Sequence, residues 1–358
     1  MKNFLICIWK IFQWIFIFNS NKKNNDIKIK PFFSGAVSGD FGGSFVKVKR
    51  LKLYFSEFFF GYNIVYILSN AIFISSRAIR YLKGHNIPII LNQNGVFYSG
   101  WYKGDWKAKN KVMSVPYHSA DYVFWQSEFC KTTANKFLGK RKGPGEILYN
   151  CVDTNFFIPL TKKNKKNDFK FLITGKIGLS LEYRIIEAIK GISYAKNKGF
   201  NFKLILAGKI DEIVLKNAFN VANKLKVFEN INFVGKYNQK NAPFIYQKAH
   251  AYVMLKYKDP CPNTVIEALS CGLPVLYSKS GGLPELVTNN CGVGLTVKNS
   301  WKDGKISPKQ VSIGKGMIQI YKNYKYLSLN ARKRAERKFD INFWFERHET
   351  IFKKYVLK

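Results

Sequence analysis

The chain has 358 residues, a length that favours two domains over one or four. Apolar residues make up 47% of the chain and charged residues 23%, which excludes wholesale disorder and a disulfide-stapled miniprotein. The formal net charge is +37, but only 9 of the 59 basic residues are arginine. Because nucleic-acid readers favour arginine for bidentate contacts, a nucleic-acid partner is not expected. The chain is rich in Lys, Asn, Ile and Phe together, so the lysine excess is typical of AT-rich codon usage combined with a general preference for anionic surfaces or substrates.

Residues 1–30 combine an apolar stretch with basic residues. Residues 4–18 are apolar except for Lys10 and Gln13, and this stretch is shorter than the ~20 residues that cross a bilayer. Four lysines follow: Lys22, Lys23, Lys28 and Lys30. An apolar helix with a basic cluster is typical of a segment that lies on an anionic membrane surface, and an extra helix packed on the fold is the alternative. We expect a cytoplasmic protein, peripheral on the inner face of the membrane.

Residues 31–152 alternate loosely between strand and helix patterns, which predicts a first α/β lobe. The candidate strands are at 31–34, 63–68, 88–91, 121–125 and 146–150, and the candidate helices are at 44–57, 74–84 and 128–138. The stretch 153–168 has no periodicity and contains Pro159 and the run KKNKKN, so it is predicted to be a linker.

Residues 169–338 alternate more regularly and predict a second α/β lobe, and a C-terminal helix at 339–358 is expected to pack back on the first. The apolar strand patterns are at 169–174, 202–208, 231–236, 251–256 and 273–278. Short apolar strands separated by helices indicate a doubly wound parallel sheet covered on both faces. Ligands of such sheets bind beyond the carboxyl ends of the strands. The loops that should line a site therefore follow Thr174, Gly235, Lys256 and Ser278.

The segment DPCPNTVIEALSCGLPVLYSKSGGLPELV, at 259–287, carries the most information about chemistry. Pro260 and Pro262 exclude a helix before Asn263, which is predicted to be its N-cap. The first amides of such a helix form an anion site that suits a diphosphate. Those amides belong to Thr264, Val265 and Ile266.

Two acidic residues accompany this helix start. Glu267 lies off the apolar stripe and on the same face as Asn263, where its carboxylate is placed to bind the two hydroxyls of a ribose. Asp259 lies eight residues before Glu267, in the loop that leaves a strand, where it is placed to reach a second polyol. Their joint placement at strand ends favours function over a solvated helix face.

This segment resembles the donor-binding signature of the retaining glycosyltransferases of the GT-B fold, family 4, also called glycosyl transferases group 1. The resemblance covers roughly residues 120–300. It implies two Rossmann-like doubly wound lobes that face a cleft. It also implies transfer of a hexose, with retention, from a nucleoside diphosphate sugar to a glycan, lipid-linked or other surface-polysaccharide acceptor. Donor-binding loop glycines implied by the resemblance are Gly42, Gly43, Gly175 and Gly235.

The chain departs from the family pattern at several positions. Asp259 stands where the family usually has Glu, and Lys176 stands where it has Arg on the diphosphate. The family's next diphosphate Lys is missing, and Arg184 is the nearby cation to replace it. In the first lobe, no His stands at the mouth of the cleft. The candidate acceptor-binding substitutes are Asn92, Asn94 and Asp105.

We expect no metal and no cofactor, since neither an Asp-x-Asp motif nor a His/Cys cluster supplies ligands. No protein nucleophile is evident, which suits front-face transfer with Asp259, Glu267 and Lys176 as the catalytic set. Two alternatives stay open. One is a nucleotide-sugar epimerase of the same fold, and the other is a basic RNA- or membrane-binding protein on a degenerate transferase fold.

Overall fold

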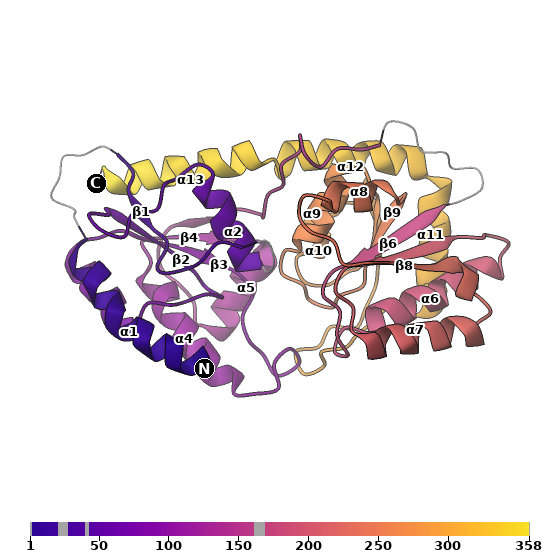
Figure 1. The fold of residues 1–358 in the computed structure, drawn as a ribbon, viewed down its shortest axis with the longest axis horizontal. Helices are drawn as coiled ribbons and strands as arrows, with labels where there is room; N and C mark the ends of the chain where they lie inside the picture. Colours follow the sequence, from indigo (N-terminus) through magenta and orange to yellow (C-terminus); the bar gives the residue numbers. More distant parts are fainter. Residues whose placement is uncertain (1, 21–27, 40–42, 161–168, 358) are drawn as a thin grey trace. The chain divides into compact units, whose positions relative to one another are not determined.

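The chain folds into two compact units in the computed structural model (Figure 1). Unit 1 comprises Met1–Tyr149 and Asn342–Lys358, and unit 2 comprises Asn150–Ile341. The structure describes residues 2–20, 28–39, 43–160 and 169–357.

Unit 1 is built on a five-stranded parallel sheet in the order β1-β2-β3-β4-β5. The three central strands are buried along their whole length, because helices cover both faces of the sheet. The strands are β1 (Pro31–Phe32), β2 (Ile64–Leu68), β3 (Ile89–Gln93), β4 (Tyr122–Trp125) and β5 (Gly145–Ile147).

Three of the helices of unit 1 begin at a side chain that accepts a hydrogen bond from the first turn. These caps are Ser75, Asp105 and Ser127. The helix that follows Asp105 was not among the predicted elements. The helices are α1 (Lys2–Phe18), α2 (Gly43–Lys52), α3 (Ser76–Gly84), α4 (Trp106–Ser119), α5 (Glu128–Phe137) and α13 (Ile341–Val356).

The C-terminal helix α13 completes the core of unit 1, on the side of the sheet opposite α1 (Figure 1). Its His348 lies 2.9 Å, through Nε2, from the hydroxyl of Tyr66 on β2, and its Phe352 packs on Phe55 and Tyr66. Complete burial lowers the pKa of His348 to about 3, and the nearby charge of Lys47 acts in the same direction. His348 is therefore a neutral core residue of unit 1.

Unit 2 contains a six-stranded sheet in the order β11-β10-β9-β6-β7-β8, and every pair of neighbours is parallel. The predicted α/β fold class is thereby confirmed for both units. The strands are β6 (Lys170–Thr174), β7 (Lys203–Ala207), β8 (Ile231–Gly235), β9 (Ala251–Met254), β10 (Val275–Ser278) and β11 (Gly292–Leu295).

Helices cover both faces of this second sheet. A core of mainly aliphatic side chains from α6, α7 and α11, joined by Tyr324 and Leu327 at the start of α12, packs against one face, and α8 and α9 lie on the other with the rest of α12 (Figure 1). The helices are α6 (Tyr183–Lys196), α7 (Glu212–Lys224), η1 (Phe228–Asn230), α8 (Ala242–Gln247), α9 (Asn263–Ser270), α10 (Leu283–Leu286), α11 (Gln310–Lys322) and α12 (Tyr324–Lys338). Because all six strands are parallel, the loops that leave them meet at one edge of the sheet.

Candidate donor site in unit 2

Glu267 lies in the middle of α9 and is buried, as is the tyrosine that contacts it. The hydroxyl of Tyr246, on α8, donates a hydrogen bond of 2.8 Å to Oε2 of Glu267. Burial and the charge of Glu267 raise the pKa of Tyr246 well above its usual value, so this tyrosine stays a donor. A buried carboxylate held in this way is pre-oriented to accept hydrogen bonds from a diol.

The first turn of α9 differs from the prediction. The helix begins at Asn263, and the preceding extended residue is Pro262, so Asn263 is the first helical residue and makes no capping bond. The amide of Val265 donates to the carbonyl oxygen of Pro262 at 3.2 Å, so it is not free to bind an anion as predicted. Thr264 lies in the same turn. Oδ1 of Asn263 is buried without a hydrogen-bond partner, which leaves an acceptor in this turn.

Asp259 follows β9 and lies buried in the loop between β9 and α9. Its Oδ2 accepts from Nζ of Lys256 at 2.7 Å, and its carbonyl oxygen accepts from the amide of Gly282 at 2.9 Å. Gly281 has a φ of +64°, and a Cβ there would lie 2.3 Å from the carbonyl oxygen of Asp259. The glycine pair after β10 therefore permits its loop to close on the loop that carries Asp259.

The residue before Asp259 was missed by sequence reasoning. Lys258 is buried and has a φ of +51°, a strained value for a residue with a side chain. Its amide donates to Oγ of Ser280, and its ammonium donates to the carbonyl oxygen of Ser300 at 2.6 Å while lying over the ring of Trp301. Its backbone strain is of the kind found at functional sites, and only its sequence position beside Asp259 could have indicated it.

Arg184 lies in the first turn of α6 and turns inward, with 4% of its surface exposed. Its Nη2 makes long contacts of 3.4 Å with the carbonyl oxygen of Thr174 and with Sδ of Met254, and its Nε has no hydrogen-bond partner. Among the residues that the structure describes, no carboxylate forms an ion pair with it. A buried cation at the positive end of a helix is unfavourable unless an anion binds beside it.

The loops after β6 and β7 approach each other closely beside Arg184. Gly175 has a φ of +133°, and a Cβ on it would lie 3.9 Å from Nη1 of Arg184. A Cβ on Gly208 would lie 2.2 Å from the carbonyl oxygen of Gly175. Lys176 follows in the same loop and is exposed, and Gly235 ends β8 with a φ of +87°. Because the glycines carry no side chains, this part of the sheet edge presents backbone groups together with the cations Arg184 and Lys176.

A series of contacts through Tyr246, Tyr252 and Thr174 links Glu267 to Arg184. The hydroxyls of Tyr252 and Thr174 lie 2.9 Å apart. Burial and the charge of Glu267 raise the pKa of Tyr237, which follows β8. The edge of the sheet thus carries neutral hydroxyls and a carboxylate suited to a polyol, next to a guanidinium suited to a phosphate. In chemical terms it suits a sugar phosphate or a nucleotide.

The three predicted acceptor-binding residues of unit 1 differ in burial and in hydrogen-bond partners. Asn92 is buried near the end of β3, and its Oδ1 accepts from Nζ of Lys47 at 2.6 Å and from Nε2 of Gln126 at 2.8 Å. Its Nδ2 is buried without a partner. Asn94 turns back to accept from the amide of Gly95, and the exposed Asp105 caps α4. The structure therefore brings Asn92 into a polar cluster and gives Asn94 and Asp105 local backbone roles.

The glycine loop of unit 1 is described in part. Gly43 is exposed and begins α2, whereas Gly42 lies outside the described residues. Within the described part of the chain, no group of three or more His, Cys, Asp or Glu side chains is arranged to hold a metal ion.

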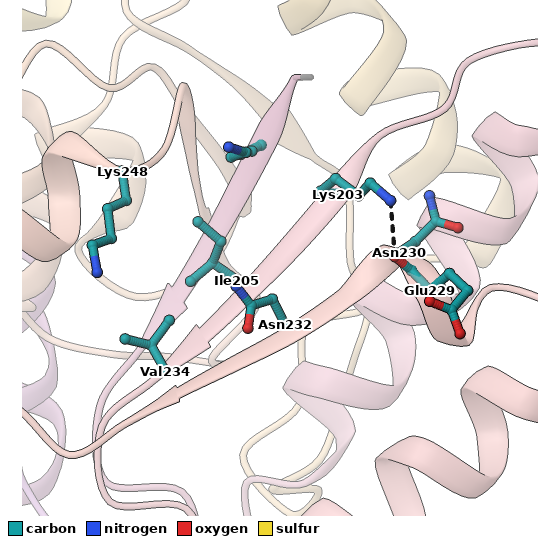
Figure 2. Close-up of a pocket in the computed structure, with 8 residues that line it drawn as sticks. Lys203, Ile205, Glu229, Asn230, Asn232, Val234 and Lys248 are labelled. Atoms are coloured by element: carbon teal, nitrogen blue, oxygen red, sulfur yellow. Dashed lines mark hydrogen bonds between the residues drawn. The ribbon is translucent and has the colours of Figure 1, made fainter. Parts of the chain in front are cut away.

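A pocket of about 400 Å³ lies in unit 2, over one face of the strands β6, β7 and β8 (Figure 2). Nζ of Lys203 donates to the carbonyl oxygen of Glu229 at its rim. Its lining residues are Lys170, Lys203, Ile205, Glu229, Asn230, Asn232, Val234 and Lys248. None of the predicted donor-site residues lines it, so this pocket is separate from the edge that carries Glu267 and Arg184.

Comparison with known proteins identifies the class to which this fold belongs. HepE of Anabaena, solved in complex with UDP, is 15% identical, with a TM-score of 0.65 over 86% of this chain and 81% of that chain. Sucrose-phosphate synthase of Thermosynechococcus elongatus is 14% identical, with a TM-score of 0.62 over 87% of this chain and 77% of that one. At these identities the likeness concerns the fold, and the chain has the GT-B fold.

The family model that matches the chain covers the sequence motifs at 259–287. The family model "Glycosyl transferases group 1" matches residues 161–334. An uncharacterized glycosyltransferase of Haemophilus influenzae is 24% identical over 157 residues, which are 44% of this chain and 43% of that protein. This chain thus aligns with less than two thirds of that relative's length. The predicted resemblance to the GT-B glycosyltransferases of group 1 is confirmed, and these comparisons support a glycosyltransferase.

Proposed function

We propose that this protein is a retaining glycosyltransferase that moves a hexose from a nucleoside diphosphate sugar to a glycan, lipid-linked or other surface-polysaccharide acceptor. The donor would bind in unit 2, at the edge where the parallel strands end. The acceptor would bind in unit 1, where Nδ2 of Asn92 is a donor without a partner within a buried polar cluster.

The observation that carries this proposal is the state of Arg184. Its guanidinium is buried in the first turn of a helix with two long contacts and no carboxylate partner among the described residues. Such a charge is stabilised by a bound anion, and a diphosphate has the charge and the oxygen atoms to form bidentate hydrogen bonds with it. Arg184 would therefore stabilise the leaving diphosphate, together with Lys176.

The two acidic residues would bind the remaining parts of the donor. Glu267, held by Tyr246, would accept hydrogen bonds from the ribose hydroxyls. Asp259, which forms an ion pair with Lys256, would orient the transferred sugar. The leaving phosphate would take the proton of the acceptor hydroxyl, so the reaction would need neither a protein nucleophile nor a metal ion.

Two measurements test the proposal. Purified protein is screened against a panel of nucleotide sugars by thermal shift, where a ligand at 100 times its dissociation constant stabilises by about 2.7 kcal/mol. The binding sugar nucleotide is then incubated with simple glycan and lipid-linked acceptors, and the anomeric configuration of the product is read by NMR. An inverted product would contradict retention, and interconversion of the donor without an acceptor would favour an epimerase. If none of the nucleotide sugars binds, the result would favour a basic RNA- or membrane-binding protein on a degenerate transferase fold.

A further inference from the structure

Helix α1 packs on unit 1 through specific polar contacts as well as apolar ones. The indole Nε1 of Trp9 donates to the carbonyl oxygen of Phe73 at 3.0 Å. Oε1 of Gln13, which is buried, accepts from the amide of Ser75, the residue that caps α3. Ile17 is completely buried. One face of α1 is therefore fixed to the lobe, and the alternative of a helix packed on the fold is correct for that face.

The other face of α1 is apolar and exposed to solvent. The exposed fractions are 72% for Ile11, 54% for Phe12, 50% for Ile15 and 59% for Phe18. Positions 11, 15 and 18 follow the spacing of one helical stripe, and position 12 lies beside it. A soluble helix that is already anchored on one side has no structural need for four large apolar side chains on its outer side.

A neighbouring loop extends this apolar surface. Phe59 and Phe60 are exposed, and each has its ring centroid 5.6 Å from that of Phe16 on α1. The amide of Gly61 donates to the carbonyl oxygen of Asn19, which fixes this loop at the end of the helix. We call the six exposed residues the apolar face. Its members are Ile11, Phe12, Ile15, Phe18, Phe59 and Phe60.

The exposed charges of α3 beside the apolar face are positive, and the largely buried carboxylate of Glu57, two residues before Phe59, is paired with Lys52. Exposed Arg77 and Arg80 lie on α3, the helix that α1 contacts through the edge-to-face pair of Phe18 and Tyr81. Residues 1–25 contain no Asp or Glu, and α3 contains none either. Two copies of such a face would repel each other through these cations. An anionic bilayer offers apolar acyl chains and negative headgroups together.

We propose that the apolar face is a docking surface for an anionic lipid bilayer, in which α1 lies in the plane of the membrane interface. This deepens the proposed function, because it places the acceptor-binding unit on the membrane. Among the described residues no helix is long and apolar enough to cross a bilayer, so the contact would be peripheral. Ile11, Phe12, Ile15 and Phe18 would enter the boundary between headgroups and acyl chains, and Arg77 and Arg80 would face the lipid phosphates.

The test is co-sedimentation of the full chain with vesicles of phosphatidylcholine alone or mixed with phosphatidylglycerol. Wild type should bind the anionic vesicles and be released by high salt. Ile15→Glu and Phe12→Glu should each lower the partition coefficient by roughly tenfold or more, since each removes an inserted apolar group and adds a repelled charge. The matched control is Ile213→Glu, a change of the same kind at an exposed position of α7 in unit 2, and it should bind as wild type does.

Equal binding by wild type, Ile15→Glu and the control would overturn the proposal, as would equal binding to neutral and anionic vesicles. Light scattering that shows a dimer dissolved by Ile15→Glu, without any vesicle binding, would assign the face to a second copy of this chain. Circular dichroism checks folding, and Ile15→Ser is the milder variant if Ile15→Glu unfolds. Nucleotide binding is measured on the same samples, so failure of the donor assignment is distinguishable from failure of membrane docking.

Discussion

The hydroxyl of Tyr246 on α8 donates a 2.8 Å hydrogen bond to Oε2 of Glu267 on α9. Both residues are buried, and 21 positions separate them in the chain. The tyrosine therefore acts as a positioning residue, because it fixes the direction in which the remaining lone pairs of Glu267 point.

Replacing Tyr246 by Phe should weaken the binding of a nucleoside diphosphate by roughly tenfold, because a hydrogen bond to a charged acceptor is worth about 1.5–3 kcal/mol. The loss should vanish with a 2′,3′-dideoxy nucleotide, which has no ribose diol for Glu267 to bind. Calorimetric titration of both ligands measures the difference. Tyr277→Phe is the matched control, since that buried tyrosine donates to the carbonyl oxygen of Val287. Equal losses for both nucleotides would show that Tyr246 only supports the fold.

Glu267→Gln should abolish donor binding while the protein stays folded, because the amide keeps the shape and loses the charge. The change is preferable to Glu267→Ala, which would leave the buried hydroxyl of Tyr246 without this acceptor. Titration with nucleoside diphosphate and a thermal melt measure the two effects. Unchanged affinity would remove Glu267 from the donor site.

Arg184→Met should stabilise the free protein by about 1–3 kcal/mol, since it removes a buried charge without a carboxylate partner among the described residues. It should also lower the turnover number by a factor on the order of 10², with a smaller effect on donor affinity. Lys190→Met on the same helix is the control, because Lys190 forms a partly exposed pair with Glu187. A fully active Arg184→Met enzyme would show that the guanidinium does not contact phosphate.

Turnover should be unchanged by EDTA, because cations of the protein are expected to neutralise the diphosphate. The measurement is the initial rate before and after chelation, with manganese or magnesium added back. A rate that EDTA abolishes and either metal restores would contradict metal independence.

Acid should destabilise unit 1 through His348. The pKa of this histidine is lowered to about 3 in the folded state, against 6.5 for the ordinary side chain, so the unfolded chain takes up a proton that the folded chain does not. Its contribution is fully present above pH 6.5 and is lost as the pH falls towards 3, at up to about 1.4 kcal/mol per pH unit. Urea unfolding at pH 7, 5 and 4 measures the slope. His348→Gln should reduce it, and an unchanged slope would assign the acid sensitivity to other groups.

The sheets were predictable from sequence and the contacts at the site were not. Strands such as β6 and β9 are short continuous apolar runs, and that pattern depends only on burial. Helix α4 was missed because Pro116 lies inside it, although its cap Asp105 was visible. Asn263 was assigned as a cap by a local rule, and the extended Pro262 takes that place. The contact of Tyr246 with Glu267 and that of Gly281 with Asp259 depend on tertiary packing.

Helix α13 has a consequence for how the chain can be synthesised and divided. Unit 1 is made of the first 149 residues and the last 17, from Asn342 to Lys358, so the chain passes between the units twice. On the ribosome, unit 1 cannot bury Tyr66 and Phe55 against Phe352 until α13 has been translated, whereas unit 2 is complete earlier. A fragment that ends at Tyr149 would expose those rings and aggregate. A circular permutant that links the end of α13 to the start of α1 and opens near residue 150 would keep unit 1 continuous.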